Sequence, residues 1–150
     1  MKYPARFVRA AEGGWLINFR DLPEAISQAE ESEDREEVAS GCLQAAIVGR
    51  IGYDMGLFPS ASPARRGERL ISLPLETAAK AALYVAMKEA NVSKSELARR
   101  LHVDEKEVRR MLDTSHATKF PRLDMAVRAL GRRLEISLAL GLSKIACNSK

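Results

Sequence analysis

Residues 94–111, with the sequence KSELARRLHVDEKEVRRM, constrain the fold more than any other part of this chain. Ser93 and Glu96 have the spacing of a capping box, and Asp104 and Glu107 repeat that spacing eleven residues later. The segment therefore predicts two short helices joined by a tight turn. Apolar residues stand where the two helices would face each other: Leu97, Ala98, Leu101, Val103, Val108 and Met111. This pattern is typical of a helix-turn-helix.

The predicted turn has one unusual residue. His102 stands where such turns usually have Gly, because the backbone there tends toward positive φ. His is among the residues that tolerate this region more often than most. We therefore expect a left-handed backbone and mild strain at His102.

A helix-turn-helix usually places its second helix in the DNA major groove. The predicted second helix exposes Lys106 and Arg110 one turn apart, and we expect these two to contact base edges. Basic side chains expected to reach phosphates surround them: Arg99, Arg100, Arg109, Lys119 and Arg122. Any one of these is more often a solvated surface charge, so the prediction rests on the cluster.

Charge is distributed unevenly along the chain. Residues 1–70 contain nine Lys/Arg and eleven Asp/Glu, a balance of −2, whereas residues 71–150 contain fifteen and nine, a balance of +6. The basic half suits attraction to phosphates. The acidic half should repel nucleic acid and suits a basic protein partner. The alternative is that both halves are ordinary solvated surfaces.

Period-two alternation predicts strands over residues 2–9 and 14–20, with a hairpin at Gly13-Gly14 between them. The inward-facing residues would be Tyr3, Ala5, Phe7, Trp15, Ile17 and Phe19. Pro4 favours an edge position or the start of its strand, because it cannot donate a backbone hydrogen bond. A short third strand is expected over residues 25–29.

A helix is expected over residues 33–51, capped by Ser32, with Leu43, Ile47 and Ile51 on one stripe. Residues 56–69 are rich in Pro, Ser, Gly and Arg and predict a linker or an exposed crossing loop. A short strand over residues 70–73 would complete the sheet. One helix would then cover one sheet face in a small βαβ-type layer.

Further helices are expected over residues 75–90 and 123–130. Residues 132–140 (RRLEISLAL) alternate again and predict a strand, which would either pair across a dimer axis or cover the chain's own helices. The last eight residues have no pattern and are expected to fray. The predicted fold is α+β: a βββαβ domain over residues 1–73, then a mainly helical domain over residues 74–150 with the helix-turn-helix and a C-terminal strand.

Several kinds of site find no support in the sequence. Cys42 and Cys147 are the only cysteines, which suits a reducing cytoplasm, and His102 and His116 lack partners at metal-ligand spacing. No glycine-rich phosphate loop, nucleophile–base arrangement or membrane-length apolar run is present. Glu12, Asp21 and Glu24 are the nearest approach to a nuclease carboxylate set, and they read as solvated turn residues. We expect no catalytic residue, cofactor or metal.

Several stretches together resemble HicB antitoxins, and more narrowly the branch with a C-terminal helix-turn-helix. They are KYPARFVRAAEGGWLINFRDLPEAISQ, GERLISLP, LETAAKAALYVAMKEANVSKSELARRLHV and LGRRLEISL, and they extend over roughly residues 1–138. The resemblance implies a partial RNase H-like N-terminal domain that binds HicA, a small basic ribonuclease toxin. It also implies a C-terminal domain that binds operator double-stranded DNA as a homodimer or higher homo-oligomer and represses its own operon.

The resemblance leaves the toxin-contacting residues unassigned. A second reading of the sequence is a stand-alone helix-turn-helix transcription regulator whose N-terminal domain senses a small molecule. The two differ in the partner of the acidic half, a basic protein in the first and a ligand in the second.

Overall fold

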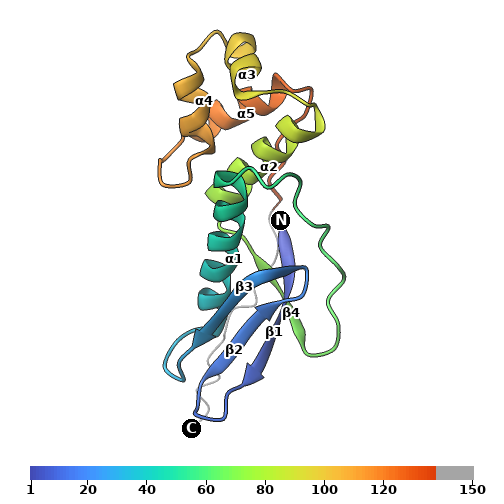
Figure 1. Cartoon of the computed structure of the whole chain (residues 1–150), viewed down its shortest axis with the longest axis vertical. Helices are drawn as coiled ribbons and strands as arrows, with labels where there is room; N and C mark the ends of the chain where they lie inside the picture. The colour runs from blue at the N-terminus through green and yellow to red at the C-terminus, as the bar shows by residue number, and fades with distance from the viewer. Residues whose placement is uncertain (138–150) are drawn as a thin grey trace.

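The structure is a computed structural model that describes residues 1–137 (Figure 1). Four strands and one helix come first, and four helices follow, which confirms the predicted α+β fold and the βββαβ order. The elements are β1 (Lys2–Arg9), β2 (Trp15–Phe19), β3 (Leu22–Ala29), α1 (Arg35–Gly52), β4 (Glu68–Ser72), α2 (Leu75–Glu89), α3 (Lys94–Leu101), α4 (Glu105–Leu112) and α5 (Phe120–Arg128). We call β1–β4 with α1 the sheet unit, and α2–α5 the helical unit.

The strands form one antiparallel sheet in the order β3-β2-β1-β4. β1 is central, yet Pro4 is tolerated because β2 pairs with β1 only from Ala5 onward. Pro4 therefore lies at the start of its strand, as predicted, and its missing N–H costs no bond to β2. β4 adds to the edge opposite β3 and is antiparallel to β1.

α1 covers one face of the sheet. Leu43, Ile47 and Ile51 are buried on the predicted stripe, against a sheet face that includes Ile17 and Phe19. The predicted cap is wrong: the helix begins at Arg35, and Asp34 rather than Ser32 accepts the hydrogen bond from the Glu36 N–H at 2.9 Å. Ser32 lies two residues too early, in the turn after β3.

β3 is longer than predicted and begins at Leu22, because a register irregularity at Asn18/Phe19 lets it pair across the expected break at Pro23. The loop before β4 ends at residue 67, so residues 68 and 69 belong to the strand. The loop is fastened to the sheet: the Tyr3 hydroxyl donates to the Pro59 carbonyl at 2.8 Å, and Ser62 donates to the Asp21 carboxylate. Residues 53–67 are therefore a crossing loop.

Figure 1 shows an elongated molecule, with α1 and the sheet at one end, α3–α5 at the other and α2 between them. The predicted C-terminal strand is wrong for residues 132–137, which have no strand structure because no described strand pairs with them. Leu134 instead packs against the core, which favours the alternative that this segment covers the chain's own helices. Residues 138–140 of the predicted strand lie outside the described residues.

Candidate nucleic-acid interface

The predicted pair of short helices is present as α3 and α4, joined by residues 102–104. Ser93 caps α3 by accepting from the Glu96 N–H at 3.1 Å, and His102 ends it with φ 53° and ψ 44°. The left-handed turn residue is therefore confirmed. The second capping box is wrong, because the Asp104 side chain makes no cap hydrogen bond. Leu97, Ala98, Val108 and Met111 are buried where the two helices meet.

The first capping box is only half formed. Instead of serving the N-terminus of α3, the Glu96 carboxylate accepts hydrogen bonds from Arg99 and Arg100, each at 2.9 Å. These hydrogen bonds lower the pKa of the Glu96 carboxyl to about 2, and the bond from Arg99 makes the largest contribution. Arg100 also reaches the Ala129 carbonyl at 3.4 Å. Both first-helix arginines are thus held by their own helix.

Four of the seven predicted site residues lie together. Lys106, Arg110, Lys119 and Arg122 line one cavity of about 410 Å³ between α4 and the segment that leads into α5. Sequence spacing places Lys106 and Arg110 on one side of a helix. The fold brings Lys119 and Arg122, about ten residues further along the chain, beside them. The result is a basic groove, by which we mean this cavity with these four side chains.

The groove holds cations that are not neutralised. Lys106, Arg110 and Lys119 form no ion pair with any residue in the part of the chain that the structure describes, whereas Arg122 pairs with Glu107. An unpaired cation beside a concave surface attracts an anion without first breaking an internal contact. The Asp104 and Glu107 carboxylates also line the groove, so its four cations leave a positive balance that attracts phosphate.

The other three predicted residues, Arg99, Arg100 and Arg109, lie elsewhere. Arg109 faces away from the groove, beside the end of α1, and pairs with Glu105, which also accepts from Ser95. Arg99 is 77% exposed on α3 and paired with Glu96. The structure therefore divides the predicted set into four residues in the groove and three outside it.

Lys80 of α2 is a residue that the sequence analysis missed. Its side chain is 0% exposed, and its amine donates to the carbonyls of Asp113 (2.6 Å) and His116 and contacts Glu76 at 3.1 Å. Glu76 also accepts from the Thr118 N–H at 3.2 Å. These contacts hold residues 113–118, which form one wall of the groove. The signal that could have identified it is a lysine between Ala79 and Ala81 on an otherwise apolar stretch of helix.

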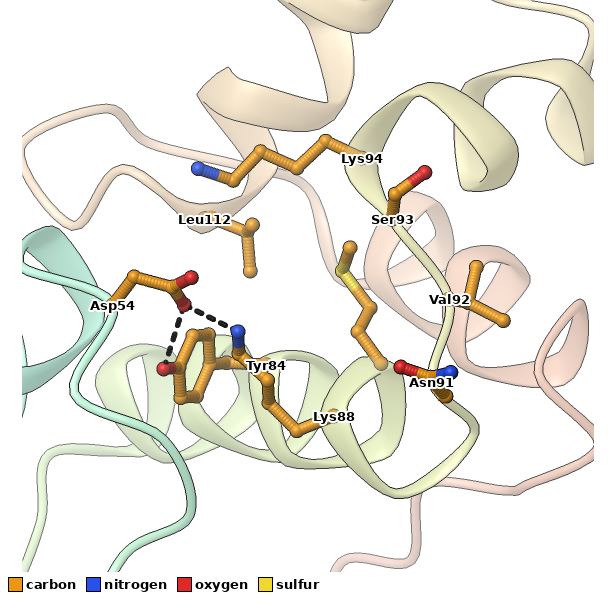
Figure 2. Close-up of a pocket in the computed structure, with 9 residues that line it drawn as sticks. Asp54, Tyr84, Lys88, Asn91, Val92, Ser93, Lys94 and Leu112 are labelled. Carbon is orange, nitrogen blue, oxygen red and sulfur yellow. Dashed lines mark hydrogen bonds and ion pairs between the residues drawn. The ribbon is translucent and has the colours of Figure 1, made fainter.

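A second cavity, of about 400 Å³, lies where the sheet unit meets the helical unit (Figure 2). On one side the Tyr84 hydroxyl donates to Asp54 at 2.9 Å, and the Lys88 amine contacts the same carboxylate oxygen at 2.6 Å. The hydrogen bonds from Lys88 and Tyr84 lower the pKa of Asp54, and the bond from Lys88 contributes most. Lys94 and Leu112 line the opposite side. This network fastens the loop after α1 to α2.

Two of the three carboxylates considered for a nuclease site have structural partners. Glu24 pairs with Arg50, and Asp21 accepts from the N–H and hydroxyl of Ser62, contacts that lower the pKa of both carboxyls. Within residues 1–137, no group of three or more His, Cys, Asp or Glu is placed to hold a metal ion. Over the same residues, no helix is both long and apolar enough to cross a membrane.

Comparison with known proteins gives one family. Residues 2–82 match the profile described as HicB_like antitoxin of bacterial toxin-antitoxin system. "Antitoxin HicB" of Escherichia coli (strain K12) is 34% identical over 136 residues, covering 91% of this chain and 98% of the relative. "Antitoxin HicB 2" of Photorhabdus laumondii is 34% identical over 91% of this chain and 95% of its own length, and "Antitoxin HicB" of Pseudomonas fluorescens is 30% identical over 87% and 90%. The chain belongs to the HicB-like family of toxin–antitoxin antitoxins, which are regulatory proteins and not enzymes.

Proposed function

We propose that this antitoxin binds a HicA-like ribonuclease toxin through its sheet unit, represses its own operon through its helical unit, and acts in the cytoplasm. Membership of the family supplies a toxin partner. The acidic balance of residues 1–70 suits a basic toxin. The basic groove is the observation that supports the second half of the proposal.

In the groove, Lys106 and Arg110 belong to α4, and Lys119 and Arg122 lie beside them on the segment that enters α5. We propose that Arg110 and Lys106 contact base edges in the major groove, and that Lys119 and Arg122 contact phosphates. Arg99 and Arg109 are ion-paired and exposed, so we assign them a weaker role at the flanking phosphates.

The operator-binding part of the proposal is tested with the Arg110→Ala variant in a gel-shift assay against the operator and a scrambled duplex. One lost bidentate base contact corresponds to about 1–3 kcal/mol, or roughly a 5- to 150-fold loss of operator affinity with a weakened sequence preference. The matched control is Arg109→Ala, the same change one residue earlier on the outside of the groove. It should lower affinity slightly and equally for both duplexes. Unchanged operator affinity in Arg110→Ala removes Arg110 from the interface.

The toxin half is tested by co-expression with the neighbouring reading frame, where a short basic protein is expected. Growth arrest by that protein should be relieved by the full chain, and equally by the Arg110→Ala variant. Because the variant separates the two activities, loss of operator binding with retained rescue supports both halves. Growth that stays arrested in the presence of the folded wild-type antitoxin contradicts the toxin half alone.

The cavity between the two units favours one other function, a transcription regulator that senses a small molecule. Its lining combines the Lys94 amine with the Asp54–Tyr84 network and is large enough for a metabolite. In that case operator affinity would depend on a small ligand and would be insensitive to the toxin. Gel shifts with and without purified toxin, at fixed antitoxin concentration, separate the two functions.

A further inference from the structure

Asp104 stands at the start of α4 but does not cap the helix. Its backbone has the extended conformation of an N-cap, φ −73° and ψ 147°, yet its side chain makes no cap hydrogen bond. The Glu107 N–H, which the carboxylate would serve in a capping box, donates to the Asp104 carbonyl at 2.9 Å. The Glu107 carboxylate pairs with Arg122. Neither side chain of the predicted capping box therefore caps α4.

The Asp104 carboxylate is exposed and lines the basic groove together with Lys106 and Arg110. In the part of the chain that the structure describes, it accepts no hydrogen bond and forms no ion pair, although both cations line the same cavity. Asp34 shows the usual outcome at an N-cap, because it accepts from the Glu36 N–H at 2.9 Å. Departures from a local rule of folding are expected where a residue serves function instead.

The negative charge of Asp104 opposes binding to the phosphates of a duplex. An ionised carboxylate only accepts hydrogen bonds, and phosphate oxygens are acceptors as well. The N-terminal residues of a recognition helix, however, contact base edges. Figure 1 shows that α4 begins near the end of the molecule farthest from the sheet, where a duplex can reach it. The carboxylate therefore lowers affinity for DNA in general and is favourable only opposite a base that donates a hydrogen bond.

Cytosine is the base that suits this carboxylate. In the major groove cytosine presents its N4 amine as a donor, guanine presents two acceptors, and thymine presents an acceptor and a methyl group. Adenine offers an N6 donor, but its neighbouring N7 acceptor repels a carboxylate. Arg110 lies six residues after Asp104, roughly 9 Å along the axis of α4, so the two side chains would contact different base pairs.

We propose that Asp104 is a specificity-determining residue of the basic groove: its carboxylate accepts a hydrogen bond from the N4 amine of a cytosine and disfavours the other three bases at that position. This inference rests on the operator binding proposed above and adds the base that the start of α4 selects. Arg110 selects guanine, whose O6 and N7 accept both guanidinium donors. The operator half-site therefore contains a guanine opposite Arg110 and a cytosine opposite Asp104.

The test replaces Asp104 with Asn and measures which sequence is preferred. The full-length wild type and Asp104→Asn each select binding sites from a pool of duplexes of random sequence. Asn suits an N-cap as well as Asp does, so thermal unfolding should not change. Asn pairs with N6 and N7 of adenine, so the cytosine of the wild-type site should become adenine. The wild type should bind the cytosine duplex at least about 5-fold more tightly than the adenine duplex, and the variant should reverse that order.

A second variant, Asp104→Ala, should lose base selection at this position alone. The matched control is Glu105→Gln, which removes the same charge one residue later. Glu105 pairs with Arg109 outside the groove, so the control should select the wild-type sequence.

Identical selected sequences for the wild type and a folded Asp104 variant overturn the proposal. An altered preference in Glu105→Gln also overturns it, because selection would then depend on charge alone. A wild type that selects no sequence contradicts operator binding itself, and this inference with it.

Discussion

The sheet unit and the helical unit are stabilised in different ways. The buried side chains of the sheet unit are almost all apolar, and its charges meet in surface pairs such as Arg9–Glu31 and Arg69–Glu36. The helical unit also has an apolar core, but it buries Lys80 completely. Exposed ion pairs contribute little, whereas loss of one partner from a buried polar cluster is costly. The helical unit should therefore be the more sensitive to a single polar substitution.

The exposed surfaces of the two units also differ. In the helical unit the buried cation holds the wall of the groove, and the exposed cations Lys106, Arg110 and Lys119 have no described ion-pair partner. In the sheet unit the large exposed side chains beside β3 and α1, Ile26, Tyr53 and Met55, are apolar. The first arrangement suits a polyanion and the second suits a protein partner.

The largest effect is expected from Lys80→Met. Methionine fills the same space but leaves the carbonyls of Asp113 and His116 without their buried donor. Two such losses should lower the free energy of unfolding by about 3 kcal/mol, measured by urea denaturation. Lys88→Met, two turns later on α2 and 34% exposed, should cost less than about 1 kcal/mol.

Equal effects of these two substitutions would remove the contrast between the units. Operator affinity provides a second comparison of the Lys80→Met and Lys88→Met variants. If Lys80 positions residues 113–118, folded Lys80→Met protein should bind the operator more weakly than Lys88→Met does at the same temperature.

Local signals predicted the elements that depend on neighbours in sequence. The Gly13-Gly14 hairpin, the α1 stripe, the Ser93 cap and the left-handed His102 all follow from residues a few positions apart. The Lys106–Arg110 pair of the candidate site was predictable for the same reason. Even here the position of a cap was uncertain by two residues, because Ser32 and Asp34 both suit an N-cap.

Contacts between distant residues were not predictable in this way. The order β3-β2-β1-β4 depends on pairings that no local pattern specifies, and the extra length of β3 depends on an irregularity in β2 pairing. Lys80 meets residues more than thirty positions away. Residues 132–137 alternate as a strand would, but alternation supplies no hydrogen-bonding partner.

Two tyrosines tie the crossing loop to the two units and allow a matched comparison. The Tyr84 hydroxyl donates to Asp54 and accepts from the Gly56 N–H at 3.2 Å, whereas the Tyr3 hydroxyl donates to Pro59 only. Tyr84→Phe should lower the free energy of unfolding by about 1–2 kcal/mol, and Tyr3→Phe by about 1 kcal/mol. Both variants keep the ring, so denaturation curves report the hydroxyl contacts. A larger loss in Tyr3→Phe would show that the sheet side of the loop matters more.

A smaller effect of opposite sign is expected from His102→Gly. His102 is exposed, and glycine removes the Cβ strain of its left-handed backbone, about 1 kcal/mol. Greater freedom of the unfolded chain offsets part of that gain. The melting temperature should therefore stay the same or rise by a few degrees. A large fall in melting temperature would mean that the imidazole packs or bonds in a way that stabilises the turn.

The smallest effect concerns pH and the first helix of the pair. The pKa of Glu96 falls from 4.5 to about 2 on folding, so its ionised form favours the folded state. The stabilisation is present above pH 4.5 and disappears as the pH falls through 2, because the folded carboxyl then becomes protonated as well. Glu96 is exposed to solvent, so salt should weaken the effect. Melting temperatures from pH 5 to pH 2 should fall less steeply in Glu96→Gln than in the wild type, and parallel curves would show that Arg99 and Arg100 do not stabilise α3 through this carboxylate.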